Sequence, residues 1–220
     1  MSSRRTLNQS AGSSNPAQKF LSWKSNEKAF SYYNKEKGEN ITLPLPLKFQ
    51  FLEDFHTVKG WHDKSESGIY SNEVKYISKE SLTVKAFKGG EIASGIYSDI
   101  RSKVRDNGGV YHRSVYVVLE DGTIANIALK GSAVSAYSDF MNENSNKVES
   151  QWIVVSGAKD MKKGATKYST PIFEIGERFT QDQMALADSK YKEIVNYYDN
   201  YTSPVAEDIT NDSDEDDLDF

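Results

Sequence analysis

Residues 110–129 read VYHRSVYVVLEDGTIANIAL, and this stretch of the 220-residue chain decides the fold. Two runs rich in β-branched and apolar residues, 110–119 and 123–129, flank Glu120, Asp121 and Gly122. An Asp-Gly pair between such runs is typical of a β-hairpin, because glycine adopts the positive φ angles of tight turns without steric cost. The sequence therefore predicts an antiparallel pair of strands in the middle of the chain.

Further strand patterns lie on both sides of this hairpin. A second hairpin is expected from the runs 29–35 and 41–52. Because proline cannot donate a hydrogen bond to a neighbouring strand, Pro44 and Pro46 predict that the second run is an edge strand or enters the sheet late, near Leu47. The other expected strands are 73–78, 81–87, 92–96, 152–156 and 171–175, with a loop over 53–72 and a basic loop between the last two strands.

Three helices are expected among these strands. Residues 98–106 and 131–144 carry helical patterns, and the second has apolar residues at three- and four-residue intervals. The third helix is predicted over 181–201, with Thr180 as N-cap and Gln183 at the capping-box position. Many short strands with long loops and about three helices predict a mainly β fold, a small and partly open barrel with appended helices.

Charge is distributed unevenly along the chain. The whole sequence carries a net charge of −5, but eight acidic residues and no Lys or Arg lie between Glu207 and Phe220. Without those eight, the rest of the chain has 27 basic and 24 acidic residues, a net charge of +3. We expect a disordered polar arm over 1–18, one folded domain over 19–201 and a disordered acidic tail over 202–220.

Composition argues against several classes of protein. The chain has no cysteine and only three histidines, and it has no apolar run long enough for a transmembrane helix, so we expect a cytoplasmic protein without membrane contact. We find no phosphate-binding loop, nucleophile elbow or zinc-protease motif, and we expect no cofactor. The one cluster that resembles an acid–base or metal site combines three acids and two histidines in a predicted loop, where such residues are common: Glu53, Asp54, His56, His62 and Asp63. We therefore expect neither catalysis nor a bound metal.

Aromatic and basic residues favour a binding function. Proteins that bind single strands without sequence preference combine a positive groove for phosphates with aromatic faces on which bases stack. This chain has ten Phe, three Trp and thirteen Tyr, and several of them adjoin Lys or Arg. Core packing of the aromatics and simple solvation of the lysines are the alternative interpretations. The candidate DNA-binding residues are Trp23, Tyr32, Trp61, Tyr70, Lys75, Arg101, Arg105, Tyr111, Arg113, Lys159, Lys162, Lys163 and Lys167.

The acidic tail ends on a large aromatic residue. A C-terminal phenylalanine offers an apolar ring and a carboxylate together, and a partner needs only an apolar pocket with basic residues at its rim to recognise both. The candidate partner-binding residues are Asp214, Glu215, Asp216, Asp217, Leu218, Asp219 and Phe220.

An aromatic, mildly basic body followed by an acidic tail with a final Phe resembles the replicative single-stranded DNA-binding proteins of bacteria and their phages. Residues 32–38 (YYNKEKG) and 67–74 (SGIYSNEV) are most similar to versions from tailed phages, including crAss-like phages of gut Bacteroidetes. The resemblance implies an OB-fold for 19–201 and coating of single-stranded DNA in replication, recombination and repair, in the host cytoplasm. It also implies recruitment of replication proteins, such as polymerase and primase-helicase, through the tail. The ending Leu218-Asp219-Phe220 differs from the bacterial Ile-Pro-Phe, so the partner's pocket is expected to differ.

Two other hypotheses remain open. A phage structural or assembly protein could use disordered ends to dock on other parts of the virion. An enzyme using the 53–63 segment would require metal-dependent nuclease activity that is lost in Glu53→Ala and His56→Ala variants.

Overall fold

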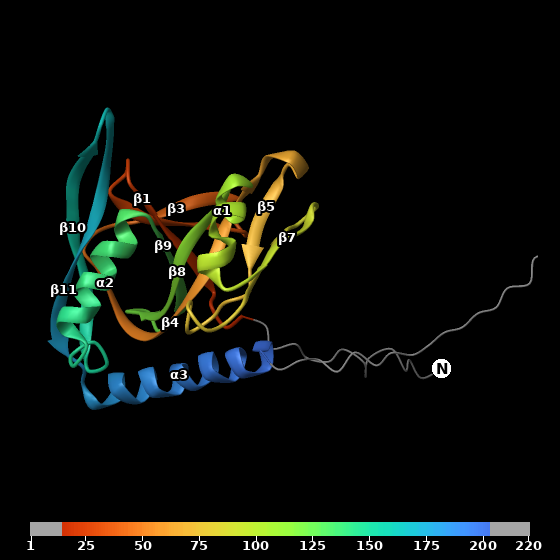
Figure 1. Cartoon of the computed structure of the whole chain (residues 1–220). Helices are drawn as coiled ribbons and strands as arrows, with labels where there is room; N and C mark the ends of the chain where they lie inside the picture. The colour runs from red at the N-terminus through yellow and green to blue at the C-terminus, as the bar shows by residue number, and fades with distance from the viewer. Residues whose placement is uncertain (1–14, 203–220) are drawn as a thin grey trace, which may run out of the picture.

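The structure, a computed structural model, describes residues 15–202 of the chain (Figure 1). Most of the expected N-terminal arm and almost all of the expected acidic tail, including the candidate partner-binding residues 214–220, lie outside the described residues. The described part is mainly β, with eleven strands in one open sheet and three helices packed against it.

Strands dominate the first half of the described chain, and the helices come later. The strands are β1 (Lys19–Lys24), β2 (Ala29–Asn34), β3 (Glu39–Leu43), β4 (Leu47–His62), β5 (Ser67–Ser71), β6 (Leu82–Ala86), β7 (Gly90–Gly95), β8 (Gly109–Leu119), β9 (Ile124–Lys130), β10 (Gln151–Lys163) and β11 (Thr166–Arg178). The helices are α1 (Tyr97–Asp106), α2 (Ser132–Asn144) and α3 (Gln181–Thr202). A single 3₁₀ turn, Asp63–Ser65, joins β4 to β5.

Strand β4 organises the sheet because it pairs along both edges. The strand order is β3-β2-β1-β9-β8-β4-β5-β6-β7, and β10 pairs with both β11 and the start of β4. One edge of β4 pairs with β8 from Phe49 to Gly60, with a bulge after Phe51. The other edge takes β10 at its start and β5 at its end. The β1–β9 pair is parallel, and all the other pairs are antiparallel.

The structure confirms the central hairpin and the three helices. Strands β8 and β9 pair from Val118–Ile124 to His112–Lys130 around the Asp-Gly turn. The capping box at the start of α3 is formed, since the backbone N–H of Thr180 donates to Gln183 Oε1 at 2.9 Å and Gln183 N–H donates to Thr180 Oγ1 at 3.3 Å. The prolines act as expected: β3 is an edge strand, and β4 begins at Leu47.

Three segments differ from the expectation. Most of the loop predicted over 53–72 is strand: residues 53–62 continue β4, because their polar side chains find partners on neighbouring strands, and Ser67–Ser71 form β5. Residues 73–78, predicted as a strand, contribute only the single bridge of Val74 to His56. The predicted basic loop between 156 and 171 is instead the outer half of the long β10–β11 hairpin, where both faces of a two-stranded ribbon meet water and no apolar alternation is needed.

The three helices pack on opposite faces of the sheet, two on one face and one on the other. Helix α2 packs on one face over the largest apolar cluster, which includes Val115 and Ile127, and α1 packs on the same face through Val104. Helix α3 packs on the opposite face, where Ile194 contacts the cluster that contains Tyr116. Helix α3 covers only the part of this face around the β8–β9 turn, and we call the part that no helix covers the open face.

Crowding of backbone at the end of β4 gives a stability prediction. A Cβ atom at Gly60 would lie 2.1 Å from the carbonyl oxygen of Gly108, so Gly60→Ala must displace main chain. We expect it to lower the free energy of unfolding by about 1–3 kcal/mol in a denaturant titration. The matched control is Gly157→Ala, whose Cβ would meet Ile172 at an ordinary 3.9 Å. Equal stability of the two variants would contradict this account of the strand end.

Candidate nucleic-acid interface

Strand register places a row of side chains across the open face. Lys59 on β4 is opposite Val110 on β8 and opposite Tyr70 on β5, and Tyr70 is in turn opposite Lys85 on β6. Residues that are directly opposite across a sheet project to the same side. One face of the sheet therefore carries a row of four side chains, Val110, Lys59, Tyr70 and Lys85. The residues two positions before and after each of them on the same strand project to this face too.

Three exposed rings form an aromatic patch on this face, which we define as Trp61, Tyr70 and Phe87. Their exposed fractions are 56%, 39% and 72%, unusually high for such large apolar groups. Tyr70 and Phe87 stack with centroids 4.5 Å apart and an interplanar angle of 29°. Gly68 lies between Trp61 and Phe87 in the same row, and a Cβ there would lie 3.2 Å from the Phe87 ring, so the glycine leaves room for it.

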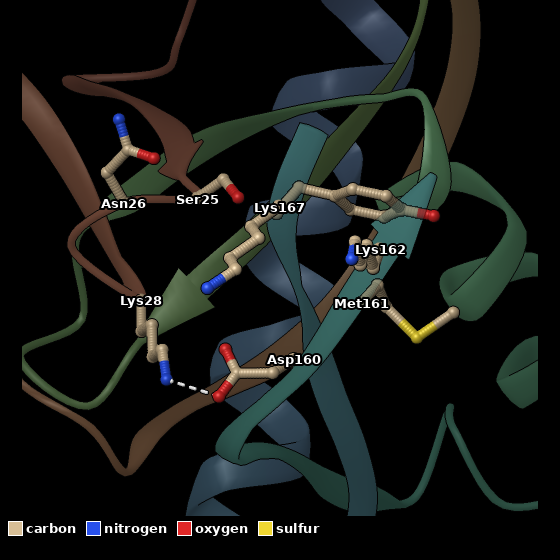
Figure 2. Close-up of a pocket in the computed structure, with 8 residues that line it drawn as sticks. Ser25, Asn26, Lys28, Asp160, Met161, Lys162 and Lys167 are labelled. Carbon is tan, nitrogen blue, oxygen red and sulfur yellow. Dashed lines mark hydrogen bonds and ion pairs between the residues drawn. The ribbon is translucent and has the colours of Figure 1, made fainter. Parts of the chain in front are cut away.

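A second feature, the lysine trough, lies where the β1–β2 turn meets the β10–β11 hairpin. Two cavities of about 510 and 550 Å³ share Ser25, Asn26 and Tyr168 and together form the trough. Figure 2 shows the first cavity, with side chains from the turn and from the hairpin converging on it. The lysines that line the trough are Lys24, Lys28, Lys130, Lys162 and Lys167.

Hydrogen bonds hold the two walls of the trough together. The backbone N–H of Ser169 on β11 donates to Ser25 Oγ at 2.5 Å, and Ser169 Oγ donates to the Ser25 carbonyl at 2.6 Å. The indole N–H of Trp23 donates to the Ser169 carbonyl at 3.0 Å. An ion pair from Lys28 Nζ to Asp160 Oδ2, 2.7 Å long, crosses between the same walls.

Positive charge in the trough is only partly neutralised. Lys162 and Lys167 are directly opposite each other on β10 and β11, and neither forms an ion pair with another described residue. Like charges opposite each other across strands are destabilising. The carboxylates that line the trough are Glu27 and Asp160, against five lysines. This excess favours an anionic ligand.

One end of the trough reaches the open face near the aromatic patch. Val110 and His112 of β8 line the trough, and Val110 is opposite Lys59, the neighbour of the patch. His112 is opposite Lys130 of β9, which also lines the trough. An extended polyanion with planar bases that crosses this border can therefore contact both features.

The structure brings some of the predicted DNA-binding residues together. Trp61 and Tyr70 are in the patch, and Lys162 and Lys167 are in the trough. Trp23 also lines the trough, although its ring packs on Phe30 of the core at 5.1 Å. Lys159 and Lys163 are exposed on the same hairpin, β10–β11.

The other predicted residues lie elsewhere. Tyr32 packs against the core on the face that carries α2. Arg101 and Arg105 are exposed on α1, and Tyr111 and Arg113 lie on the face that α1 and α2 cover. Lys75 forms an ion pair with Glu53 beside α3, with 2.6 Å between Nζ and Oε2.

Sequence reasoning missed several residues of the open face: Lys24, Lys28, Lys59, Lys85, Phe87 and Lys130. A usable signal exists for two of them. Lys85 and Phe87 alternate with the apolar Val84 and Ala86 in a predicted strand segment, and this places them on its outer side.

Arg113 belongs to a polar network beneath α2. Its guanidinium donates to Asp54 Oδ1 at 2.6 Å and to His56 Nε2 at 2.6 Å, and the Tyr137 hydroxyl donates to Asp54 Oδ2 at 2.9 Å. Burial, together with the neighbouring Arg113 charge, lowers the pKa of His56 to about 4. The polar residues of the 53–63 segment thus have structural partners. No group of three or more His, Asp or Glu within residues 15–202 is arranged to hold a metal ion.

A second network lies under the open face. The carboxylate of Glu73 accepts hydrogen bonds from Ser114 Oγ and from the Tyr116 hydroxyl, the latter at 2.8 Å. Burial raises the pKa of Glu73. Asn126 donates to Ser114 Oγ at 2.6 Å, so these hydrogen bonds join β8, β9 and the segment after β5.

Comparison of the chain with protein-family models, curated proteins and solved structures finds no match. None of the described helices has the length and apolar character needed to cross a membrane. Function must therefore be argued from the residues of the open face.

The two buried histidines predict how stability depends on pH. Burial lowers the pKa of both His56 and His112 to about 4, from 6.5 in the unfolded chain. Folding thus favours their neutral forms, so their stabilising contribution is complete above pH 6.5 and is lost as the pH falls towards 4. We expect urea titrations to show a loss of about 1 kcal/mol per histidine between pH 7 and 5, after allowance for solvent screening. A His56→Gln/His112→Gln variant with the same pH slope as the natural protein would refute this.

Proposed function

We propose that this protein binds single-stranded DNA without sequence preference and coats it during phage replication, recombination and repair, in the cytoplasm of the host. The observation that carries the proposal is that the lysine trough borders the sheet face that carries the aromatic patch. Charge for phosphates and ring faces for bases are the two elements that this kind of binding requires.

The side-chain chemistry supports binding that does not read sequence. All five cations of the trough are lysines, which act as point charges on flexible stems. An arginine fork, by contrast, recognises the edge of guanine through two parallel hydrogen bonds. The exposed rings of the patch offer stacking surfaces, and every base has a face that can stack on them.

The strand order also supports an OB-like core as part of this proposal. Strand β4 is long and bulged, begins the meander β4–β5–β6, and pairs with β8 after the helix α1. Strands β8 and β9 then close a hairpin. An OB-fold is a five-stranded, partly open barrel that binds oligonucleotides across the face of its second and third strands. If β4 is the first strand of such a barrel, those strands are β5 and β6, which carry Tyr70 and Lys85.

We further propose that the acidic tail recruits replication proteins, such as a polymerase or a primase-helicase, through residues 214–220. Support comes from the tail's sequence, which combines clustered acids with the terminal Phe220. The end of α3 lies beside the open face, because Tyr198, Tyr70 and Lys85 line one cavity of about 710 Å³. The last described turn of α3 is therefore close to the proposed DNA-binding surface.

Titration with oligo(dT) tests the DNA-binding proposal. Of the three tryptophans, Trp61 is 56% exposed, whereas Trp152 is 6% exposed, so stacking on Trp61 should quench much of the accessible fluorescence. We expect Trp61→Phe to bind DNA but to lose most of the quenching. Trp61→Ala should lose about 1–3 kcal/mol of binding free energy. Lys192→Ala, a change on the exposed surface of α3, is the control. Absence of binding by the natural protein in low salt would refute the proposal.

Tail variants test the proposed division between DNA binding and partner binding. Deleting Glu207–Phe220 removes eight carboxylates that compete with DNA for the lysines, so single-strand affinity should rise at low salt and the gain should fade as salt increases. Removing Phe220 alone should leave DNA affinity unchanged and abolish partner binding, measured by pull-down of the phage or host polymerase. Weaker DNA binding after the long deletion would contradict this division.

A further inference from the structure

Three lysines and one carboxylate line the first cavity of the trough. Lys28 comes from the β1–β2 turn, Lys162 from β10 and Lys167 from β11. Among the residues that line this cavity, Asp160 is the only acid, and its carboxylate pairs with Lys28 at 2.7 Å (Figure 2). Asp160 is thus bound to Lys28 in a cavity that Lys162 and Lys167 also line.

The Lys28–Asp160 ion pair is not what holds the trough together. Its side chains are 49% and 74% exposed, and ion pairs with this much exposure contribute little to stability. The hydrogen bonds between Ser25 and Ser169 already join the turn to the hairpin. A change at Asp160 should therefore leave the walls of the trough in place.

The backbone at Lys28 gives independent support for a role of this lysine. Its φ angle is +52°, in the left-handed region that glycine adopts easily and that a lysine adopts at a cost. Strained positions of this kind concentrate at functional sites. A lysine at this position fits a need for its ammonium group in the trough.

We infer that Lys28, Lys162 and Lys167 form a subsite for one phosphodiester group of single-stranded DNA, and that the Asp160 carboxylate occupies it until DNA displaces it. Carboxylate and phosphodiester both present anionic oxygens to Lys28, so binding exchanges one anion for another at this lysine. With Asp160 beside it, Lys28 adds no net positive charge to the subsite, so DNA releases fewer of its condensed cations on binding. The inference rests on the proposed function and adds a built-in competitor to it.

The test compares oligo(dT) affinity of the full chain and of Asp160→Asn over a range of salt concentrations. Without the Asp160 carboxylate, Lys28 adds one net positive charge to the subsite, so DNA releases the condensed cations of one more phosphate on binding. We therefore expect the log–log salt slope to steepen by about 0.7, the value for one phosphate of a single strand. If the two proteins bind oligo(dT) equally at 1 M salt, this steeper slope makes Asp160→Asn bind about eightfold more tightly than the natural protein at 50 mM salt and less than twofold more tightly at 0.5 M.

Two further variants make the test specific. Glu177→Gln changes net charge equally and breaks an exposed ion pair with Lys48, at the other end of β11, so its salt slope should equal that of the natural protein. Lys28→Gly removes the ammonium and relieves the backbone, and in this background Asp160→Asn should have no effect. Circular dichroism and the unfolding midpoint check that each variant is folded.

The outcomes separate this inference from the proposed function. If the natural protein binds oligo(dT) and Asp160→Asn binds equally or more weakly, the competitor role of Asp160 is wrong while the DNA-binding function stands. An equal gain in Glu177→Gln would also overturn the subsite, because net charge alone would then explain the effect. If the natural protein fails to bind at all, the proposed function is wrong.

Discussion

Pairing of β4 along both of its edges fixes the positions of the trough and the patch relative to each other. One edge carries β8, whose Val110 and His112 line the trough, and the other edge carries β10 and then β5. The hairpin that supplies lysines and the meander that supplies rings are thus hydrogen-bonded to one continuous strand. Because protein cores are closely packed and do not deform gradually, the spacing between the two surfaces is set before a ligand arrives.

The open face results from an unequal covering of the sheet. Helices α1 and α2 both pack on one face, over two apolar clusters, whereas α3 alone packs on the other. Beyond α3 this face carries polar side chains such as Lys59 and the buried His112, and Glu73 and Ser114 hydrogen-bond on the same face. A sheet face without a helix over it can remain in water only if its side chains are hydrophilic or bind something. The open face carries both lysines and rings.

Local patterns predict the elements better than they predict which face each residue occupies. The Asp-Gly hairpin and the Thr180–Gln183 capping box depend on neighbours in sequence, and both are present. Proximity to Tyr111 makes Arg113 a candidate for DNA contact, yet it is paired with Asp54, 59 positions away. Sequence reasoning misses Lys28 because its place in the trough depends on the contact between the β1–β2 turn and the β10–β11 hairpin. Such long-range pairing leaves no periodic trace in sequence.

The departures from ordinary folding preferences gather on the open face. Lysines are opposed at positions 162 and 167, Lys28 has a positive φ angle, and Trp61 and Phe87 are largely exposed. None of these features stabilises the isolated domain, and a sequence selected for stability alone would remove each of them. A bound single strand would relieve two of them together: phosphates would neutralise the opposed lysines, and bases would cover the rings. Residues at a functional site often depart from ordinary folding preferences. Several such departures on neighbouring surfaces, which one ligand would relieve, are therefore expected of a functional site. This coincidence, more than any one residue, is the reason to place DNA on this face.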